Sequence, residues 1–363
     1  MRLLLLIVSL LLTCAAKSLS QSFSLYLIGD CGEDMQPGPA LQLLEFYLNK
    51  EDEHSAVIFL GDNSYPKGLF PPGSKKREES ELKLHTQLDR VKQFFGSAVM
   101  IPGNHDWKKS NWGGLKQVQE EEKFVHYYWS DTSFHISNKK HCFLPQAGFP
   151  GPASLLLDST LKIRLIAFDA QWWLQRQWFH KAGKEEGKSY RKMSDEFFIK
   201  LRSVMNEAES NHEQVILASH HPLLTAGEHG VRKTVPYILA TYTPLIIFRP
   251  MGLNRLFRQD ITSNSYSRLI DSLTGIINEH HNVIYVSGHD HNLQYFNGEH
   301  GNVFIVSGAG SKTNPFAKKP SSTPLWGNDD DTGFFHLKMN ASGITDVKVF
   351  TPKKPDGEQV NLK

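Results

Sequence analysis

Aspartate, asparagine and histidine residues follow short apolar runs at five places in this chain of 363 residues. The motifs IGDCG, LGDNSY, PGNHD, SHHP and SGHDHN supply, in chain order, Asp30, Asp62, Asn104, His220, His289 and His291. Carboxylate, amide and imidazole groups bind metal ions in proteins. A metal ion held in this way activates water and stabilises negative charge on an oxygen atom. The motifs therefore predict a metal site.

Each motif is weak when it is taken alone. A Gly-Asp pair after a strand is usually a turn with a capping carboxylate, and two histidines spaced two apart are often a surface pair. The order of all five motifs, each at the end of a predicted strand, is what indicates one shared site.

Alternating strands and helices must position these motifs. Apolar and β-branched runs predict strands over residues 24–28, 56–60, 98–101, 163–168, 214–218, 283–287, 303–306, 334–339 and 344–350. Helical periodicity predicts helices over residues 40–49, 82–95, 117–128, 194–210 and 267–279. This order favours a mixed α/β sheet, in which ligands gather at the carboxyl ends of the strands. Tight turns there are expected to need the glycines that precede four of the motif residues: Gly29, Gly61, Gly103 and Gly288.

The composition is that of a globular enzyme. Hydrophobic residues make up 40% of the chain, charged residues 21%, and the formal net charge is +2. This balance gives no reason to expect nucleic acid or an anionic membrane as the main partner. No internal repeat or linker divides the chain, so a single domain is predicted over residues 21–351. It carries an insertion at about 234–263 and is followed by a frayed tail over residues 352–363.

The first 20 residues are predicted to be a signal peptide. Arg2 precedes an apolar run over residues 3–12, which is too short to span a bilayer, and small residues follow it. Export to a secreted, periplasmic or lumenal location is therefore expected. A lipoprotein anchor at Cys14 is the alternative, disfavoured because Thr13 is larger than the residue usual before such a cysteine. For Cys31 and Cys142, two free thiols are favoured over a disulfide bridge.

The series GD, GDN, GNHD, HxP and GHDH resembles the motifs of the calcineurin-like metallophosphoesterases. Most of that family carry a metal-binding histidine two residues after the first aspartate, where this chain has Gly32. Tyr65 instead follows Asp62 by three residues, an exchange similar to that of the small, mammalian-type, tartrate-resistant purple acid phosphatases. The resemblance implies a four-layer αββα sandwich, an α/β fold in which two mixed β-sheets are flanked by helices.

The resemblance also implies the metals and the residues that bind them. A ferric ion would be bound by Asp30, Asp62, Tyr65 and His291, and a divalent iron, zinc or manganese ion by Asp62, Asn104, His220 and His289. The register of HxP favours His220 over its neighbour His221. Exchanging a neutral imidazole for tyrosinate adds a negative charge, which a trivalent ion offsets.

The implied activity is hydrolysis of small phosphate monoesters by a metal-bound hydroxide, best at mildly acidic pH. His105 and His229 would protonate the leaving group and stabilise transferred charge. Two alternatives stay open: a phosphodiesterase or nucleotide hydrolase on the same scaffold, and a catalytically silent protein that binds metal or phosphate. The insertion at 234–263 is interpreted as extra packing over the core, with a lid or a membrane-surface contact as alternatives.

Overall fold

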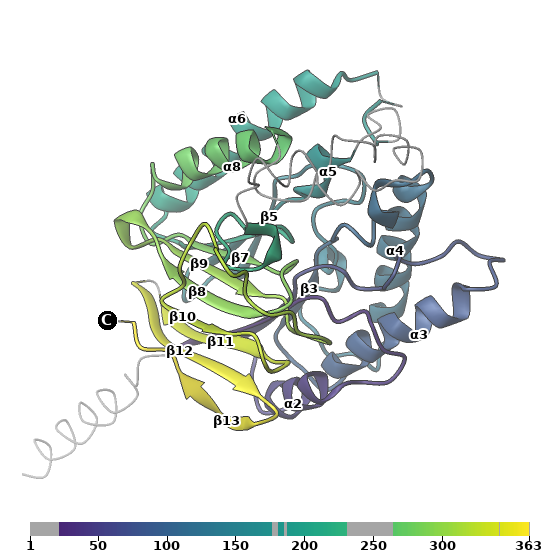
Figure 1. Ribbon diagram of the computed structural model, residues 1–363, viewed down its shortest axis with the longest axis horizontal. Coiled ribbons are helices and arrows are strands. Elements are labelled where there is room, and N and C mark those ends of the chain that lie inside the picture. The colour runs from purple at the N-terminus through teal and green to yellow at the C-terminus, as the bar shows by residue number, and fades with distance from the viewer. Residues whose placement is uncertain (1–21, 176–180, 185–186, 231–263, 341, 363) are drawn as a thin grey trace, which may run out of the picture.

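Two β-sheets pack face to face, and helices cover their outer surfaces, in the computed structural model of the chain (Figure 1). The structure describes residues 22–175, 181–184, 187–230, 264–340 and 342–362. The four-layer αββα sandwich expected from the sequence is confirmed. The predicted signal peptide at 1–20 and the insertion at 234–263 lie outside the described residues.

The first sheet has the strand order β13-β12-β11-β1-β2-β3. Strands β1, β2 and β3 are parallel, whereas β11 pairs antiparallel with both β1 and β12, so the sheet is mixed. The strands are β1 (Phe23–Ile28), β2 (Ser55–Phe59), β3 (Ser97–Met100), β11 (Phe334–Asn340), β12 (Gly343–Thr351) and β13 (Lys354–Gln359).

The second sheet has the strand order β10-β8-β9-β7-β6-β5-β4 and is also mixed. Its parallel centre consists of β5, β6, β7 and β9. The strands are β4 (Ala153–Asp158), β5 (Ile163–Ala167), β6 (Gln214–Ala218), β7 (Ile284–Ser287), β8 (Leu293–Asn297), β9 (Val303–Ser307) and β10 (Trp326–Asn328).

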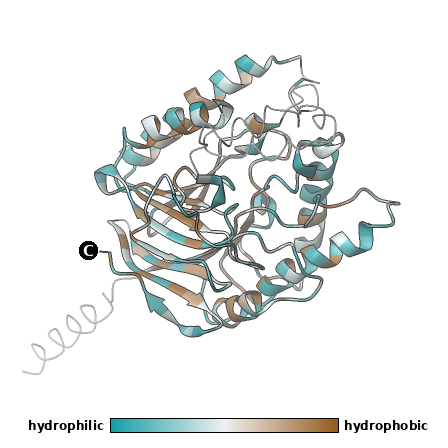
Figure 2. Cartoon of the chain, viewed as in Figure 1, coloured by the Kyte–Doolittle hydropathy of each residue, from teal (hydrophilic) through white to brown (hydrophobic). Residues whose placement is uncertain are grey.

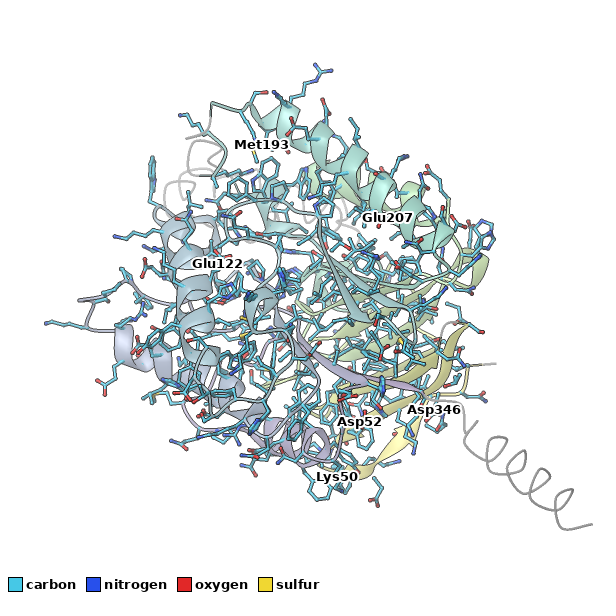
Figure 3. The ribbon with its side chains drawn as sticks, turned by 180° about the vertical axis from the view of Figure 1, so that it is seen from behind. Lys50, Asp52, Glu122, Met193, Glu207 and Asp346 are labelled. Atoms are coloured by element: carbon cyan, nitrogen blue, oxygen red, sulfur yellow. The ribbon has the colours of Figure 1, made fainter. Side chains whose placement is uncertain are left out.

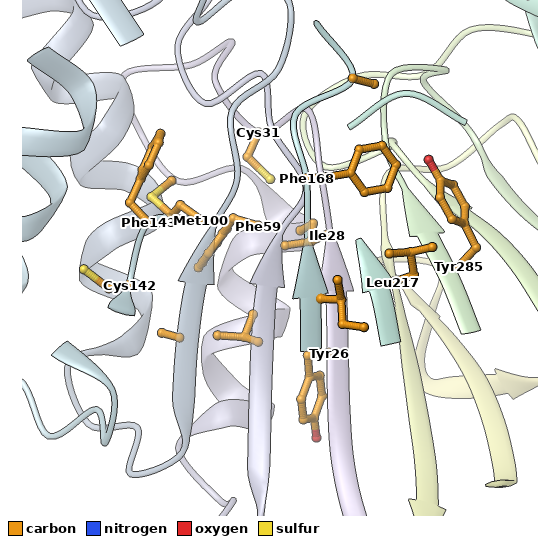
Figure 4. Packing of buried hydrophobic residues seen from close by; sticks show 14 of the residues in the cluster. Tyr26, Ile28, Cys31, Phe59, Met100, Cys142, Phe143, Phe168, Leu217 and Tyr285 are labelled. Atoms are coloured by element: carbon orange, nitrogen blue, oxygen red, sulfur yellow. The ribbon is translucent and has the colours of Figure 1, made fainter. Parts of the chain in front are cut away.

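The alternation of side chains along each strand fills two apolar layers. In β1, Leu25 and Leu27 point into the layer between the sheets, while Tyr26 and Ile28 point to the helices on the outside. Figure 4 shows this outer layer, and Figure 2 shows apolar residues concentrated on the strands. Burying one large apolar side chain stabilises the folded state by about 2 kcal/mol. The many buried side chains of the two layers therefore hold the strands, and the turns at their ends, in fixed positions.

Helices lie on the outside of both sheets. Those over the first sheet are α2 (Pro39–Leu48), α3 (Arg77–Leu88) and α4 (Gly114–Trp129), and those over the second are α5 (Gln171–Leu174), α6 (Tyr190–Ser210) and α8 (Asn264–Ile277). Short 3-10 turns are η1 (Asp89–Val91), η2 (Lys108–Ser110), η3 (Lys139–His141), η5 (Glu228–Gly230) and η8 (Glu299–Gly301). Among the described residues, no helix combines the length and apolar character needed to span a membrane.

Helix α6 illustrates why such a segment is helical. Its buried residues recur every three or four positions: Met193, Phe197, Leu201, Met205 and Ala208. The Ser189 side chain caps its first turn by accepting a hydrogen bond from the backbone N–H of Lys192. Figure 3 shows α6 from behind, with Met193 and the exposed Glu207 labelled on it.

Two predictions about the elements need correction. The tail from residue 352 onward is not frayed, because β13 pairs antiparallel with β12 along the sheet edge. The helix predicted over 82–95 instead begins at Arg77 and gives way to η1 after Leu88. Glu78 and Glu79 in its first turn favour the earlier start through the helix dipole.

Candidate metal centre

The carboxyl ends of strands from both sheets meet at one edge of the sandwich. Strands β1, β2 and β3 are followed by Asp30, Asp62 and Asn104, and β6 and β7 are followed by His220, His289 and His291. The two groups contact each other directly, since the His289 backbone N–H donates to Asp30 Oδ2 at 2.8 Å. The structure thus brings together side chains up to 261 positions apart in the sequence.

The turns that bear these residues differ from the expected ones. Left-handed backbone conformations fall on the motif residues themselves, with φ of 59° at Asp30, 55° at Asp62 and 72° at His289. Of the four preceding glycines, only Gly61 has a positive φ. Gly103 is required for space instead, because a Cβ there would come within 2.3 Å of Asp62 Oδ1.

One half of the site gathers nitrogen and oxygen atoms around an amide. Asn104 Oδ1 lies 3.1 Å from His220 Nε2 and 3.0 Å from His289 Nδ1, and these two nitrogens are 3.3 Å apart. Asp62 Oδ1 is 3.5 Å from His220 Nε2. The Leu60 carbonyl accepts from His220 Nδ1 at 2.7 Å, which turns Nε2 toward the centre.

The other half gathers around the phenol of Tyr65. Its hydroxyl donates to Asp30 Oδ1 at 2.8 Å and lies 3.1 Å from His291 Nε2. His291 Nε2 is in turn 3.5 Å from Asp30 Oδ1. Asp30, Asp62 and His220 form a buried group whose ligand atoms all lie within 4.8 Å of one another. All seven side chains predicted to bind metal therefore converge.

The donor atoms and their charges fit a pair of cations. Asp30 and Asp62 are 0% and 1% exposed, and two buried carboxylates are costly unless positive charge compensates them. Burial opposes the charged form of His220, yet the Asp62 carboxylate raises the pKa of His220 to about 10. Burial and the charges of Asp30 and Asp62 raise the pKa of Tyr65 well above its ordinary value. Positive charge is thus stabilised here, and ionisation of Tyr65 requires a cation beside it.

Two further histidines flank the centre. His105 Nδ1 donates to the Pro66 carbonyl at 2.9 Å, and His105 Nε2 lies 3.7 Å from Asp62 Oδ2. Its ring packs edge-on against Tyr65, and burial lowers its pKa to about 4. His229, in η5, stacks on His289 with 4.2 Å between ring centroids. Both histidines predicted to act in catalysis therefore contact residues of the centre.

Several residues near the motif positions make contacts of their own and are not among the proposed ligands. His221 packs against His289 and Tyr266, and burial lowers its pKa well below the ordinary value. Asp106 accepts hydrogen bonds from the backbone N–H groups of Asn63, Ser64 and Gly103. Cys31 and Cys142 are free and buried, as the sequence favours.

Sequence reasoning missed Asp290, which lies between the two histidines of GHDH. It accepts hydrogen bonds from the Thr225 hydroxyl and from the His229 backbone N–H, at 3.4 Å for the latter. A Cβ at Gly227 would come within 2.4 Å of its carboxyl carbon. Asp290 therefore fixes the loop that carries His229. Its position between the two histidines of GHDH is the sequence feature that could have indicated this role.

Comparisons with known proteins agree with this geometry. The profile of the calcineurin-like phosphoesterases matches residues 23–293. Mouse tartrate-resistant acid phosphatase type 5 is 25% identical over 169 residues, which cover 41% of this chain and 40% of that protein. The chain thus spans less than half the length of this curated relative. Purple acid phosphatase 17 of Arabidopsis thaliana is 23% identical over 337 residues, covering 88% of this chain and 79% of that protein.

A solved structure shares the fold at lower identity. GAP50, described as the anchor in the inner membrane complex of Plasmodium, has a TM-score of 0.52 and 15% sequence identity. The match covers 94% of this chain and 89% of that chain. This likeness supports the arrangement of the sheets. It does not indicate the chemistry, which depends on the side chains of the site.

Proposed function

The chain belongs to the calcineurin-like phosphoesterase family, and we propose that it hydrolyses small phosphate monoesters at a pair of metal ions. A ferric ion would be bound by Asp30, Asp62, Tyr65 and His291, and a divalent iron, zinc or manganese ion would be bound by Asp62, Asn104, His220 and His289. When bound, such a pair of ions would supply an activated water molecule and positive charge for the phosphate oxygens.

The chain's own residues orient and protonate the reacting groups. The backbone N–H of His105 donates to Asp62 Oδ1 at 2.8 Å, which fixes the carboxylate that would be shared by both ions. His105 Nδ1 donates to the Pro66 carbonyl, so when the ring is protonated its Nε2 is the atom that gives a proton to the leaving oxygen. His229, held through Asp290, stabilises charge transferred to the phosphate.

The observation that carries the proposal is the pairing of Tyr65 with Gly32. A Cβ at Gly32 would come within 2.4 Å of the Asn63 backbone carbonyl carbon, so a histidine side chain has no room there. The Tyr65 hydroxyl instead lies beside Asp30 and His291. A hard oxygen donor at this position favours a ferric ion over a softer divalent one.

Turnover of matched substrates tests the activity. The purified protein should hydrolyse an aryl phosphate monoester at least about tenfold faster, in kcat/KM, than the diester with the same leaving group, because a diester needs room for a second ester group. Phosphate release at pH 5 to 6 measures both rates. A faster diester reaction would instead favour the phosphodiesterase alternative, and phosphate binding without turnover across a wide pH range would favour a silent binding protein.

The visible spectrum tests the ferric assignment. Iron-loaded protein should be purple or pink through charge transfer from tyrosinate to ferric iron, and Tyr65→Phe should abolish the band because the phenolate oxygen is lost. Tyr47→Phe is a matched control, since the Tyr47 hydroxyl donates to the Pro355 carbonyl. Active, colourless protein that holds only zinc or manganese would contradict the ferric site and leave the phosphoesterase activity standing.

We also propose that the protein is exported. The support is the N-terminal segment, in which Arg2 precedes an apolar run over residues 3–12. Comparison of the amino terminus of the purified native protein with the encoded one tests this proposal.

A further inference from the structure

Lys312 holds an ammonium group over the ring of Tyr65. It lies in the loop between β9 and β10, and its Nζ is 3.7 Å from the centroid of the Tyr65 ring. A cation within about 6 Å of the face of an aromatic ring attracts the π electrons of that ring. Tyr65 is 4% exposed and the Lys312 side chain is 33% exposed, so water screens this contact only in part. Lys312 is not among the proposed ligands or proton donors.

The loop that carries Lys312 is anchored to the proposed centre on both sides of this residue. The Ser311 hydroxyl donates to the Asp30 carbonyl oxygen, and the Asn314 backbone N–H donates to the His291 carbonyl at 2.7 Å. Asn314 Nδ2 also lies 3.2 Å from His291 Nδ1. The position of the ammonium group is therefore set by a loop that contacts two of the proposed ferric ligands.

Other charged groups near Tyr65 contact other atoms. Asp30 Oδ1 accepts from the Tyr65 hydroxyl at 2.8 Å, and Lys83 Nζ donates to the Tyr65 carbonyl oxygen at 3.1 Å. Glu33, with its side chain 45% exposed, accepts from Lys312 Nζ at 2.6 Å and offsets part of the ammonium charge. Substituting Lys312 alone leaves all of these groups in the chain. The sign of its effect on the ring is therefore the sign of the one charge that is removed.

A cation at this place changes how strongly Tyr65 can donate electrons. Because the ammonium group attracts the π electrons of the ring, the ring releases less electron density through its oxygen atom. An ion bound to that oxygen would keep more of its positive charge, which attracts phosphate. The contact also compensates part of the negative charge that a tyrosinate brings in place of a neutral histidine.

We propose that Lys312 is a positioning residue that weakens electron donation from Tyr65 to the ferric ion. This inference rests on the proposed phosphoesterase function and its ferric site, and it gives the loop after β9 a role that the seven ligands do not explain. Lys312 acts through the phenol ring and not on the substrate. Its effect should therefore be measurable in the electronic properties of the iron-loaded protein, separately from stability and turnover.

The visible spectrum of single variants provides the first test. Lys312→Met keeps a side chain of similar length and removes the charge. In the iron-loaded variant, the tyrosinate-to-iron band should move to longer wavelength by on the order of 10 nm, because the ring holds its electrons less tightly. Lys312→Arg should restore the wild-type position, since a guanidinium group also stacks on an aromatic face. Lys123→Met is the matched control, since Lys123 lies on α4 with its side chain 72% exposed.

The reduction potential of the iron-loaded protein provides a second readout. In Lys312→Met, the stronger phenolate donor should shift the equilibrium between ferric and ferrous iron about tenfold toward ferric, a decrease of about 59 mV for one electron. A potentiometric titration followed through the same band measures this shift. Lys312→Arg should stay within about twofold of the wild-type equilibrium. A loosened loop would instead lower the iron content and the height of the band, and leave its wavelength and the potential unchanged.

Glu33→Gln separates the charge of Lys312 from its ion pair. Glutamine keeps an oxygen acceptor for Lys312 Nζ and removes the compensating charge, so the band should move to shorter wavelength. An unchanged band and potential in Lys312→Met, or a shift in the same direction in both variants, would overturn the inference. Iron-loaded wild-type protein without the band would overturn it together with the ferric assignment. Hydrolysis of phenyl phosphate decides the proposed function separately, because the spectrum and the potential do not depend on turnover.

Discussion

Asp62→Asn should lower kcat/KM for an aryl phosphate at least about 1000-fold, a loss of about 4 kcal/mol in transition-state stabilisation. Asp62 is the carboxylate between the two halves of the site, with Oδ1 3.5 Å from His220 Nε2 and Oδ2 3.7 Å from His105 Nε2. Burial disfavours its charge, yet His105 and His220 hold the pKa of Asp62 below its ordinary value. The carboxylate is therefore available to bind cations, and asparagine has one donor oxygen fewer and no charge.

Metal analysis separates this effect from misfolding. The Asp62→Asn variant should bind less than one metal ion per chain. Its unfolding temperature should be close to that of the metal-free wild-type protein, because the substitution also removes the desolvation cost of a buried charge. Asp195→Asn is the matched control on α6, where the side chain is 65% exposed. A fully metallated Asp62→Asn protein with more than a tenth of wild-type activity would exclude Asp62 as a shared ligand.

His105→Asn should lower kcat for an alkyl phosphate about 100-fold, within the range that a positioned proton donor supplies. An alkoxide leaves poorly unless it is protonated, whereas nitrophenolate leaves readily. The loss for p-nitrophenyl phosphate should therefore be less than about fivefold. The hydrogen bond from Nδ1 to Pro66 makes this expectation specific, since it leaves Nε2 of the protonated ring to serve as the donor.

The dependence of the rate loss on the leaving group distinguishes two roles of His105: donating a proton and holding the proposed metal ligand Asp62 in place. If His105→Asn lowered both rates equally and also reduced metal content, His105 would act by holding Asp62 in place. His281→Asn is a suitable control, because His281 is exposed at the amino end of β7, opposite the candidate centre. Its variant should retain both rates.

The candidate site was predictable because its signals are local. Each motif residue directly follows an apolar run, and parallel strands end at a common edge, so the sequence alone groups Asp30, Asp62, Asn104, His220 and His289 in one place. The choice of His220 over His221 rested on local register as well. The structure places His220 Nε2 beside Asn104, whereas His221 packs behind His289.

The remaining features depend on contacts that sequence spacing does not encode. The segment Lys354–Gln359 has no alternation of apolar residues, and it is a strand because β12 offers a free edge for pairing. The left-handed conformations fall on Asp30 and His289 themselves and not on the glycines that precede them. Lys312 has no local signal, since only the fold carries it to Tyr65.

The position of β1 inside its sheet has a consequence for how the protein is made. β1 pairs on one side with β2, which follows soon after it, and on the other with β11, which begins only at Phe334. During synthesis the second edge of β1 thus stays unpaired until nearly the whole chain has left the ribosome. The first-translated ligand, Asp30, becomes fixed only when one of the last-translated strands arrives. A nascent or truncated chain that ends just before β11 therefore carries all seven proposed ligands without a centre able to hold metal ions.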